Sequence, residues 1–151
     1  MWGSGKILEN VFSLVSEIPV VKNTQAKFVN SNEVNAAFNK KGWYSLYKND
    51  VTLAELNLTE DVSGLVRLSG PNNVKGDWFT TMNEIRGLSP AQLKNKFALK
   101  YAPTNMTPVS LNGPVRVGEA AKVPEFGQGG GFQIEALPGS QVNYGKTVPL
   151  Q

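Results

Sequence analysis

Residues 64–80 read Gly64-Leu65-Val66-Arg67-Leu68-Ser69-Gly70-Pro71-Asn72-Asn73-Val74-Lys75-Gly76-Asp77-Trp78-Phe79-Thr80. Successive side chains of a strand point to opposite faces, so the first six residues place Val66 and Leu68 on one face and Leu65, Arg67 and Ser69 on the other. The proline, asparagines and glycines that follow predict a turn, and Trp78-Phe79-Thr80 predict a second strand. We therefore expect an antiparallel hairpin with Arg67 and Thr80 on neighbouring strands.

Further strands and helices are predicted on both sides of this hairpin. Apolar alternation between turn residues marks strands at 51–56, 106–111, 115–117 and 131–137. Helical spacing predicts one amphipathic helix from Ser4 to Pro19 and another from the N-cap Ser31 to a stop at Gly42. Short helices should follow Thr81 and Ser89, because both residues begin capping boxes. Residues 140–151 fit either a last strand or a loosely ordered tail.

The order of these elements predicts an α+β fold, in which N-terminal helices precede a small, mostly antiparallel β core with short capped helices. We expect residues 1–42 to form a helical segment for packing or for entering a cell, and residues 43–151 to form the α+β domain that carries the function. A chain of 151 residues with 40% hydrophobic content is long enough for one core.

The composition narrows the chemistry. Cysteine and histidine are both absent, which excludes disulfides, thiolate nucleophiles and the commonest metal ligand and proton-transfer group. We expect no metal site and no bound cofactor. No apolar run approaches the roughly 20 residues that cross a bilayer, so stable membrane insertion is not expected. The net charge of +3 suits an acidic partner, although the basic residues are scattered and fit a solvated surface better than a phosphate track.

A glycine-rich segment, Phe126-Gly127-Gln128-Gly129-Gly130-Gly131-Phe132-Gln133-Ile134-Glu135, supplies a candidate site. Glycine runs indicate close approach of the backbone to other backbone or to a ligand, which makes Gly130 and Gly131 candidate substrate contacts. Strand alternation places Gln133 and Glu135 on one face, where an amide and a carboxylate suit oxocarbenium-like chemistry without histidine. A tight hairpin and a surface pair on an edge strand are the alternatives.

Three further regions offer candidate contacts. Arg67 lies in an otherwise apolar strand and suits a phosphate clamp or a structural ion pair. Thr80 precedes the capping Thr81 and is free to meet a ligand, whereas Trp78 suits a core position better than the wall of an aromatic-base site. Tyr101 and Thr104 lie in a proline-bounded loop that can reach a site.

The chain resembles a known group of toxins in a series of motifs: Leu65-Val66-Arg67-Leu68-Ser69-Gly70, Gly76-Asp77-Trp78-Phe79-Thr80, Gly87-Leu88-Ser89-Pro90-Ala91-Gln92, Lys96-Phe97-Ala98-Leu99 and Gly118-Glu119-Ala120-Ala121 through Gln133. Over residues 43–137 these are similar to the C-terminal toxin domains of bacterial contact-dependent growth inhibition and other polymorphic toxin proteins. The last part also resembles the end of tuberculosis-necrotizing-toxin-type domains, which hydrolyse NAD and are distantly related to ADP-ribosyltransferases.

The resemblance implies that Gln133 is the catalytic glutamine and that Arg67 matches a phosphate-binding arginine. The leading hypothesis is an antibacterial toxin that splits the nicotinamide-ribosyl bond of NAD, with Arg67 on the pyrophosphate, Thr80 on the ribose or nicotinamide, and Gln133 with Glu135 at the reacting carbon. The alternatives are a toxin ribonuclease that cleaves tRNA and a non-enzymatic module that binds a protein partner.

The resemblance also implies a biological setting. Residues 43–151 would be the toxin catalytic domain of a larger secreted or cell-surface protein, which acts in the cytoplasm of target bacteria. We expect any secretion signal to lie outside these 151 residues. A cognate immunity protein should block the site, and an acidic one would complement the charge of +3.

Overall fold

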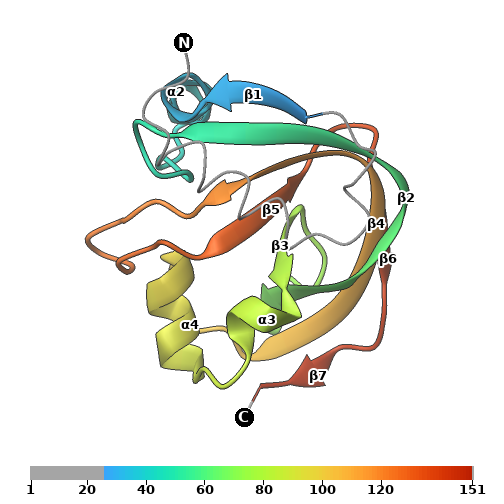
Figure 1. Ribbon diagram of the computed structural model, residues 1–151. Helices are drawn as coiled ribbons and strands as arrows, with labels where there is room; N and C mark the ends of the chain where they lie inside the picture. The colour runs from blue at the N-terminus through green and yellow to red at the C-terminus, as the bar shows by residue number, and fades with distance from the viewer. Residues whose placement is uncertain (1–25, 151) are drawn as a thin grey trace.

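The computed structural model describes residues 26–150 as an antiparallel β fold with a few short helices (Figure 1). The strands are β1 (Ala26–Asn30), β2 (Thr52–Ser69), β3 (Trp78–Thr81), β4 (Asn105–Glu119), β5 (Phe132–Ala136), β6 (Gln141–Tyr144) and β7 (Val148–Pro149). The helices are α2 (Ser31–Lys40), α3 (Met82–Ile85) and α4 (Pro90–Phe97). The mostly antiparallel β core with short helices is therefore confirmed, whereas the helix predicted at 4–19 lies outside the described residues.

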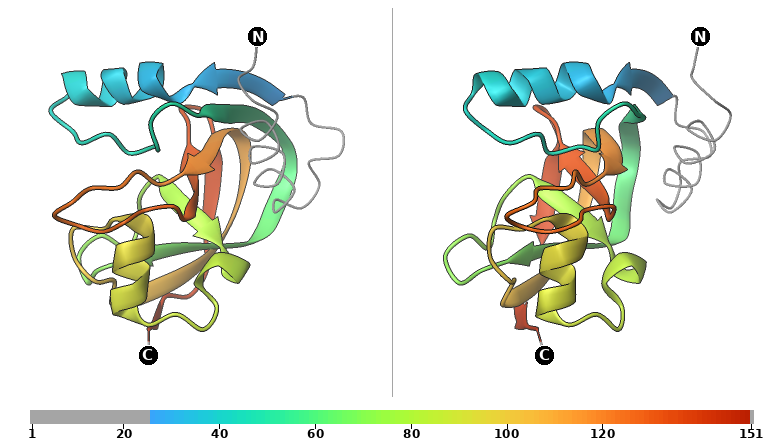
Figure 2. Two further views of the ribbon diagram at one scale, coloured as in Figure 1. Left: turned by 60° about the vertical axis from the view of Figure 1, so that its left-hand side comes forward. Right: turned by 90° about the vertical axis from the view of Figure 1, so that its left-hand side faces the viewer.

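The central strands form a closed circuit. The order along the sheet is β1-β2-β3-β5-β4-β6, and β2 also pairs directly with β4, while β7 pairs with β4. Strands β2, β3, β5 and β4 thus follow one another and return to β2, with all pairings antiparallel. The two long strands β2 and β4 curve around this circuit (Figures 1 and 2). The predicted hairpin is confirmed, because Val66 of β2 pairs with Thr80 of β3.

Each long strand replaces two shorter ones in the prediction. The separate strands predicted at 51–56 and 64–69 are continuous in β2, and those at 106–111 and 115–117 are continuous in β4, so the predicted breaks are wrong. The interruptions are irregularities within the strands, with φ of 79° at Gly64 and 89° at Gly113. The β2–β4 register shifts twice between Leu58 and Leu65. Such shifts bend a strand without ending it. The glycines that suggested loops therefore lie at bends within continuous strands.

The hydrophobic clusters lie on opposite sides of the sheet. The largest includes Leu65 of β2 and the inward side chains of β5, which are Phe132, Ile134 and Ala136, as alternation predicted. A second cluster joins Val66 of β2 to helices α3 and α4 through Ile85, Leu93 and Phe97. Because side chains alternate along residues 64–69, Leu65 packs in one core and Val66 packs in another on the opposite face of β2.

The first described elements form a unit on one edge of β2. Strand β1, which the sequence did not predict, pairs with residues 52–56 of β2. Helix α2 follows as predicted, but its N-cap is Asn30, whose side chain accepts a hydrogen bond from the backbone N–H of Asn32 at 2.8 Å. Ser31 instead accepts from the backbone N–H of Val51 through its Oγ at 3.1 Å. Phe38 of α2 packs with Tyr47 and Leu53, which fastens this unit to the sheet.

One of the two predicted capping boxes forms. Ser89 and Gln92 exchange the expected hydrogen bonds at the start of α4, with Pro90 at the first helical position. The box predicted at Thr81 is wrong, because Thr81 makes no side-chain cap on α3. Its would-be partner Glu84 instead accepts a hydrogen bond from the backbone N–H of Phe132 at 2.7 Å. Glu84 therefore holds the start of β5.

The glycine run packs tightly against the protein itself. It belongs to the loop 120–131 between β4 and β5, which closes through paired hydrogen bonds between residues 120 and 130–131. The backbone N–H groups of Gly129 and Gly131 donate to the carbonyls of Asn95 and Lys96 at the end of α4. A Cβ at Gly129 would lie 2.3 Å from the carbonyl oxygen of Ala121, and one at Gly131 would lie 2.6 Å from the Phe97 ring. Close approach therefore accounts for Gly129 and Gly131, whereas Gly130 has open space around it and a φ of 93°.

Gly129 and Gly130 offer a matched test of this packing. Both have positive φ, 73° and 93°, but only a Cβ at Gly129 meets neighbouring atoms. Alanine at either position should cost about 1–2 kcal/mol of backbone strain. Gly129→Ala should lose roughly a further 1–3 kcal/mol because the loop must shift away from Ala121. Urea unfolding measures both, and equal losses in the two variants would contradict the close approach.

Candidate functional site

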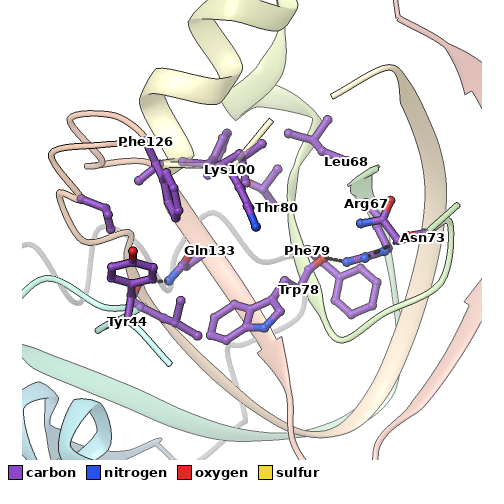
Figure 3. Close-up of a pocket in the computed structure, with 15 residues that line it drawn as sticks. Tyr44, Arg67, Leu68, Asn73, Trp78, Phe79, Thr80, Lys100, Phe126 and Gln133 are labelled. Carbon is purple, nitrogen blue, oxygen red and sulfur yellow. Dashed lines mark hydrogen bonds between the residues drawn. The ribbon is translucent and has the colours of Figure 1, made fainter. Parts of the chain in front are cut away.

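A cavity of about 330 Å³ opens between the sheet, the end of α4 and the segment after α2. Figure 3 shows the side chains around it, which come from β2, β3, β5, the end of α4 and four connecting segments. The lining residues are Tyr44, Leu46, Arg67, Leu68, Asn73, Trp78, Phe79, Thr80, Phe97, Ala98, Leu99, Lys100, Val123, Phe126 and Gln133. Four predicted site residues, Arg67, Trp78, Thr80 and Gln133, therefore meet around one space of the size that small-molecule ligands occupy.

Gln133 is held in a defined orientation at this cavity. Its Nε2 donates to the backbone carbonyl of Leu46 at 2.7 Å. A carbonyl only accepts hydrogen bonds, so the contact assigns the NH₂ group to Leu46 and leaves Oε1 for another donor. The partner of Gln133 on β4 is Gly118, where a Cβ would lie 2.4 Å from Leu53 and 3.0 Å from Tyr47. Because Gly118 has no side chain, Leu53 and Tyr47 can pack directly against β4 at this point.

Arg67 organises the turn that follows its own strand. Its Nε, Nη1 and Nη2 donate to the backbone carbonyls of Val74, Trp78 and Asn73 at 3.0–3.1 Å. The side chain is buried, with 8% of the residue exposed, and within the described residues it forms no salt bridge. Burial lowers the pKa of Arg67 from its ordinary value. The predicted ion pair is therefore absent from this part of the chain.

The guanidinium of Arg67 keeps donors in reserve. It carries five N–H groups, and the three hydrogen bonds to carbonyls use one on each nitrogen, which leaves two. Gly76 packs directly on this group, since a Cβ there would lie 2.4 Å from Nη2. Asp77 is near enough to oppose the lowering of the pKa of Arg67 but forms no salt bridge with it. A buried cation that is oriented by carbonyls and has N–H groups to spare can still bind an anion.

Thr80 and Trp78 line the cavity from β3. The Thr80 hydroxyl donates to the backbone carbonyl of Phe132 at 2.6 Å, so its oxygen is left to accept a hydrogen bond. The Trp78 ring lies 5.6 Å from that of Tyr47 and 6.1 Å from that of Phe38. Trp78 therefore serves both of the roles that the sequence left open, since it packs in an aromatic cluster and also walls the cavity.

Other lining residues were not predicted as site residues. The rings of Tyr44 and Phe126 pack edge to face at 5.2 Å, and the Tyr44 hydroxyl donates to Glu125 at 3.2 Å. Lys100 points into the cavity (Figure 3). Its place after α4 follows from the Ser89 cap and the helix length, but its direction depends on the turn at Ala98, which has φ of 49°. Nothing in the sequence pattern marks Tyr44.

Glu135 does not line this cavity. Its Oε1 accepts hydrogen bonds from Arg116 Nη1 at 2.8 Å and from the Tyr47 hydroxyl at 3.0 Å. Arg116 also pairs with Glu55 at 2.9 Å, so the three charges bridge β2, β4 and β5. Burial raises the pKa of Glu135, although Arg116 and the hydrogen bonds oppose that rise. Burial and the nearby Glu135 together raise the pKa of Tyr47 well above its ordinary value. In the sequence, the feature that could have indicated this network is Arg116, a charged residue between Val115 and Val117.

The remaining predicted residues lie elsewhere. Tyr101 and Thr104 line a second cavity of about 510 Å³ next to the first. Gly130 and Gly131 line neither cavity, and their N–H groups donate to Ala120 and Lys96. Among residues 26–150 no group of three acidic side chains is placed to hold a metal ion, and no helix is long and apolar enough to span a membrane.

No model of a protein family, no curated protein and no solved structure matches this chain. The residues that meet at the first cavity are therefore the basis for a functional proposal.

The Arg116 network gives a test that depends on pH. At pH 7, Arg116→Gln should lower the free energy of unfolding by about 3 kcal/mol, because Glu55 and Glu135 lose their buried cation. The pKa of Glu135 then rises further, so the folded state binds more protons than the unfolded chain above the ordinary carboxyl pKa. Stability of the variant is therefore greatest below that value and falls as the pH rises through the raised pKa.

Urea titrations between about pH 4 and about pH 7 measure this dependence, since the range spans the usual pKa of glutamate. The double variant Arg116→Gln/Glu135→Gln is the control, and it should lose most of the extra slope. A deficit for Arg116→Gln that is the same at both ends of the range would contradict the role assigned to the network.

Proposed function

We propose that the chain is a toxin effector domain that hydrolyses the nicotinamide-ribosyl bond of NAD. The observation that supports this proposal best is the meeting of Gln133, Thr80, Trp78 and Arg67 at one cavity. These residues come from the β2–β3 hairpin and from β5, which is distant in sequence, and together they supply an amide, a hydroxyl oxygen, an aromatic wall and a cation. NAD offers a matching set of groups, namely ribose hydroxyls, a flat nicotinamide ring and a pyrophosphate.

The proposed reaction needs no histidine and no metal ligand from the chain. Water attacks C1′ of the nicotinamide ribose as the bond from C1′ to the ring nitrogen breaks, and the bonding electrons neutralise the positive pyridinium. The products are nicotinamide, ADP-ribose and one proton. Positive charge develops on the ribosyl carbon in the transition state, so a fixed dipole with its negative end toward that carbon accelerates the step.

Gln133 is the residue to which we assign this task. Because Leu46 fixes Nε2, Oε1 can accept from a ribose hydroxyl or from the attacking water while its partial charge faces C1′. Thr80 accepts from the ribose or from the nicotinamide amide, and Trp78 lies against the ring. Arg67 holds the pyrophosphate with its two spare N–H groups. In this arrangement Glu135 takes no part in bond cleavage, because it does not line the cavity and its hydrogen bonds go to Tyr47 and Arg116.

A tRNA ribonuclease is the second candidate. Arg67 and Lys100 both line the first cavity, and such cations also stabilise the charge that develops when a phosphodiester is cleaved. The NAD reaction fits the glutamine and the aromatic wall better, because phosphodiester cleavage has no evident use for either. Total tRNA incubated beside NAD separates the two reactions. The third candidate, a non-enzymatic binding module, predicts that neither substrate changes.

We further propose that the domain is delivered to the cytoplasm of target bacteria as part of a larger secreted or cell-surface protein. A cognate immunity protein, acidic to complement the net charge of +3, would neutralise it. The product of a neighbouring gene should then bind the purified chain and abolish hydrolysis. An acidic partner should also bind more weakly at high salt.

Gln133→Ala tests the catalytic assignment. Loss of a single group that stabilises transition-state charge typically lowers kcat by about 100-fold or more. We expect that loss in nicotinamide release from NAD, measured by chromatography. Gln128→Ala is the matched control, because Gln128 is an exposed glutamine on the preceding loop and does not line the cavity. It should retain the activity of the unmodified chain.

Thermal unfolding of both variants checks that they fold. If folded Gln133→Ala releases nicotinamide as fast as the unmodified chain, the catalytic assignment is wrong. If the unmodified chain leaves NAD intact and cuts tRNA, the ribonuclease is the correct function.

A further inference from the structure

The second cavity adjoins the first and shares part of its wall. It lies between the turn after β2 and the segment after α4, which pass close to each other. Leu68, Asn73, Leu99 and Lys100 line both cavities. A ligand longer than the first cavity can therefore extend into the second without leaving the protein surface.

Ser69 belongs to the wall of the second cavity but offers it no hydrogen-bonding side chain. The residue is 3% exposed, and its Oγ is fully buried with no hydrogen-bond partner within the described residues. Strand alternation directs this side chain to the face of Leu65, opposite to that of Leu68, which lines the cavity. A ligand in the cavity therefore does not reach Ser69 Oγ.

Tyr101 presents an aromatic surface at the same cavity. It is the most exposed large hydrophobic side chain among the described residues, with 73% of the residue accessible. Lys100 Nζ lies 5.6 Å from the centre of its ring. An aromatic ring that is left open at the wall of a cavity, beside a cation, suits a flat heterocycle that carries a phosphate.

Hydrogen-bond donors gather where the two cavities meet. Asn73 accepts a hydrogen bond from the backbone N–H of Gly70 at 2.7 Å through Oδ1, which directs its Nδ2 away as a donor. Lys100 forms no salt bridge within the described residues, and Arg67 lines the first cavity nearby. Two cationic groups and an amide N–H therefore lie close to the shared wall, which suits phosphate oxygens.

We propose that the second cavity is a nucleotide subsite. The base stacks on Tyr101, and the phosphate lies against Lys100 and Asn73. If the proposed function holds, on which this reading of the ligand rests, the subsite takes the adenosine monophosphate half of NAD while the nicotinamide mononucleotide half occupies the first cavity. Tyr101 would then determine affinity for the dinucleotide and take no part in bond cleavage.

Calorimetric titration of the full chain with AMP tests the subsite directly, without any reaction. Tyr101→Ala should weaken AMP binding by roughly 10-fold or more, because it removes the stacking surface. Trp43→Ala is the matched control, since Trp43 is 49% exposed and has Lys41 over its ring at 5.0 Å but lines neither cavity. It should bind AMP as the unmodified chain does.

Ser69→Ala gives a second control. Because Ser69 Oγ is fully buried without a partner, this variant should bind AMP as the unmodified chain does, and urea unfolding should show no loss of stability. AMP that fails to bind the unmodified chain, or that binds Tyr101→Ala and Trp43→Ala equally, would overturn the subsite.

Kinetic measurements distinguish a failure of the subsite from a failure of the proposed function. Tyr101→Ala should raise KM for NAD about as much as it weakens AMP binding, with kcat retained and with hydrolysis of nicotinamide mononucleotide unchanged. Normal NAD hydrolysis by Tyr101→Ala would reject the subsite and leave the proposed function intact. AMP binding that depends on Tyr101 in a chain that does not hydrolyse NAD would support the subsite and reject the proposed function.

Discussion

The pairing of β2 with β4 is the constraint on which the rest of the structure depends. The two strands pair from Ala54 and Val117 at one end to Ser69 and Asn105 at the other, although the register shifts between. Strands that pair over such a length without twisting apart must bend, and the irregularities near Gly64 and Gly113 provide the bend. Because the same two strands also pair with β3 and β5, the bend closes the circuit. All other described strands and the helices attach to this frame.

The frame also explains how the first cavity is assembled. Arg67, Thr80 and Gln133 lie on three strands of the circuit, so their spacing is fixed by backbone hydrogen bonds. Each of the three side chains also donates to a backbone carbonyl, which removes much of its remaining freedom. Groups ordered in this way lose little entropy when a ligand binds. The cavity is thus organised before any ligand arrives, which the proposed electrostatic catalysis would require.

Local patterns predicted the parts of the fold that depend on neighbouring residues. Alternation in β5 gave the correct inward face, the turn after Ser69 gave the hairpin, and Ser89 gave a correct helix start. The failures involve contacts distant in sequence. Turn residues at 113–114 suggested a break, although pairing with β2 carries β4 through them. Glu84 matches a capping box by spacing, but β5 offers it a better donor at Phe132.

The candidate site shows the same division. Four residues chosen from sequence meet at one cavity, because the hairpin and the β5 face were predicted correctly. Glu135 was chosen for its place beside Gln133 on the same face, but that face also meets Arg116 and Tyr47, which no local pattern predicts. The glycine run indicated a close approach, yet only the fold shows that α4 and residues 120–121 make that approach.

The central claim is that NAD binds at the cavity where Gln133 is oriented. The most direct measurement is a titration of ¹⁵N-labelled protein with carbocyclic NAD, which cannot be hydrolysed, while NMR follows side-chain N–H signals. The account predicts saturable shifts at the Gln133 amide and the Trp78 indole, with little change at Gln128 and Trp43, which lie outside the cavity. The absence of any saturable shift at Gln133 and Trp78, or shifts confined to other side chains, would contradict it.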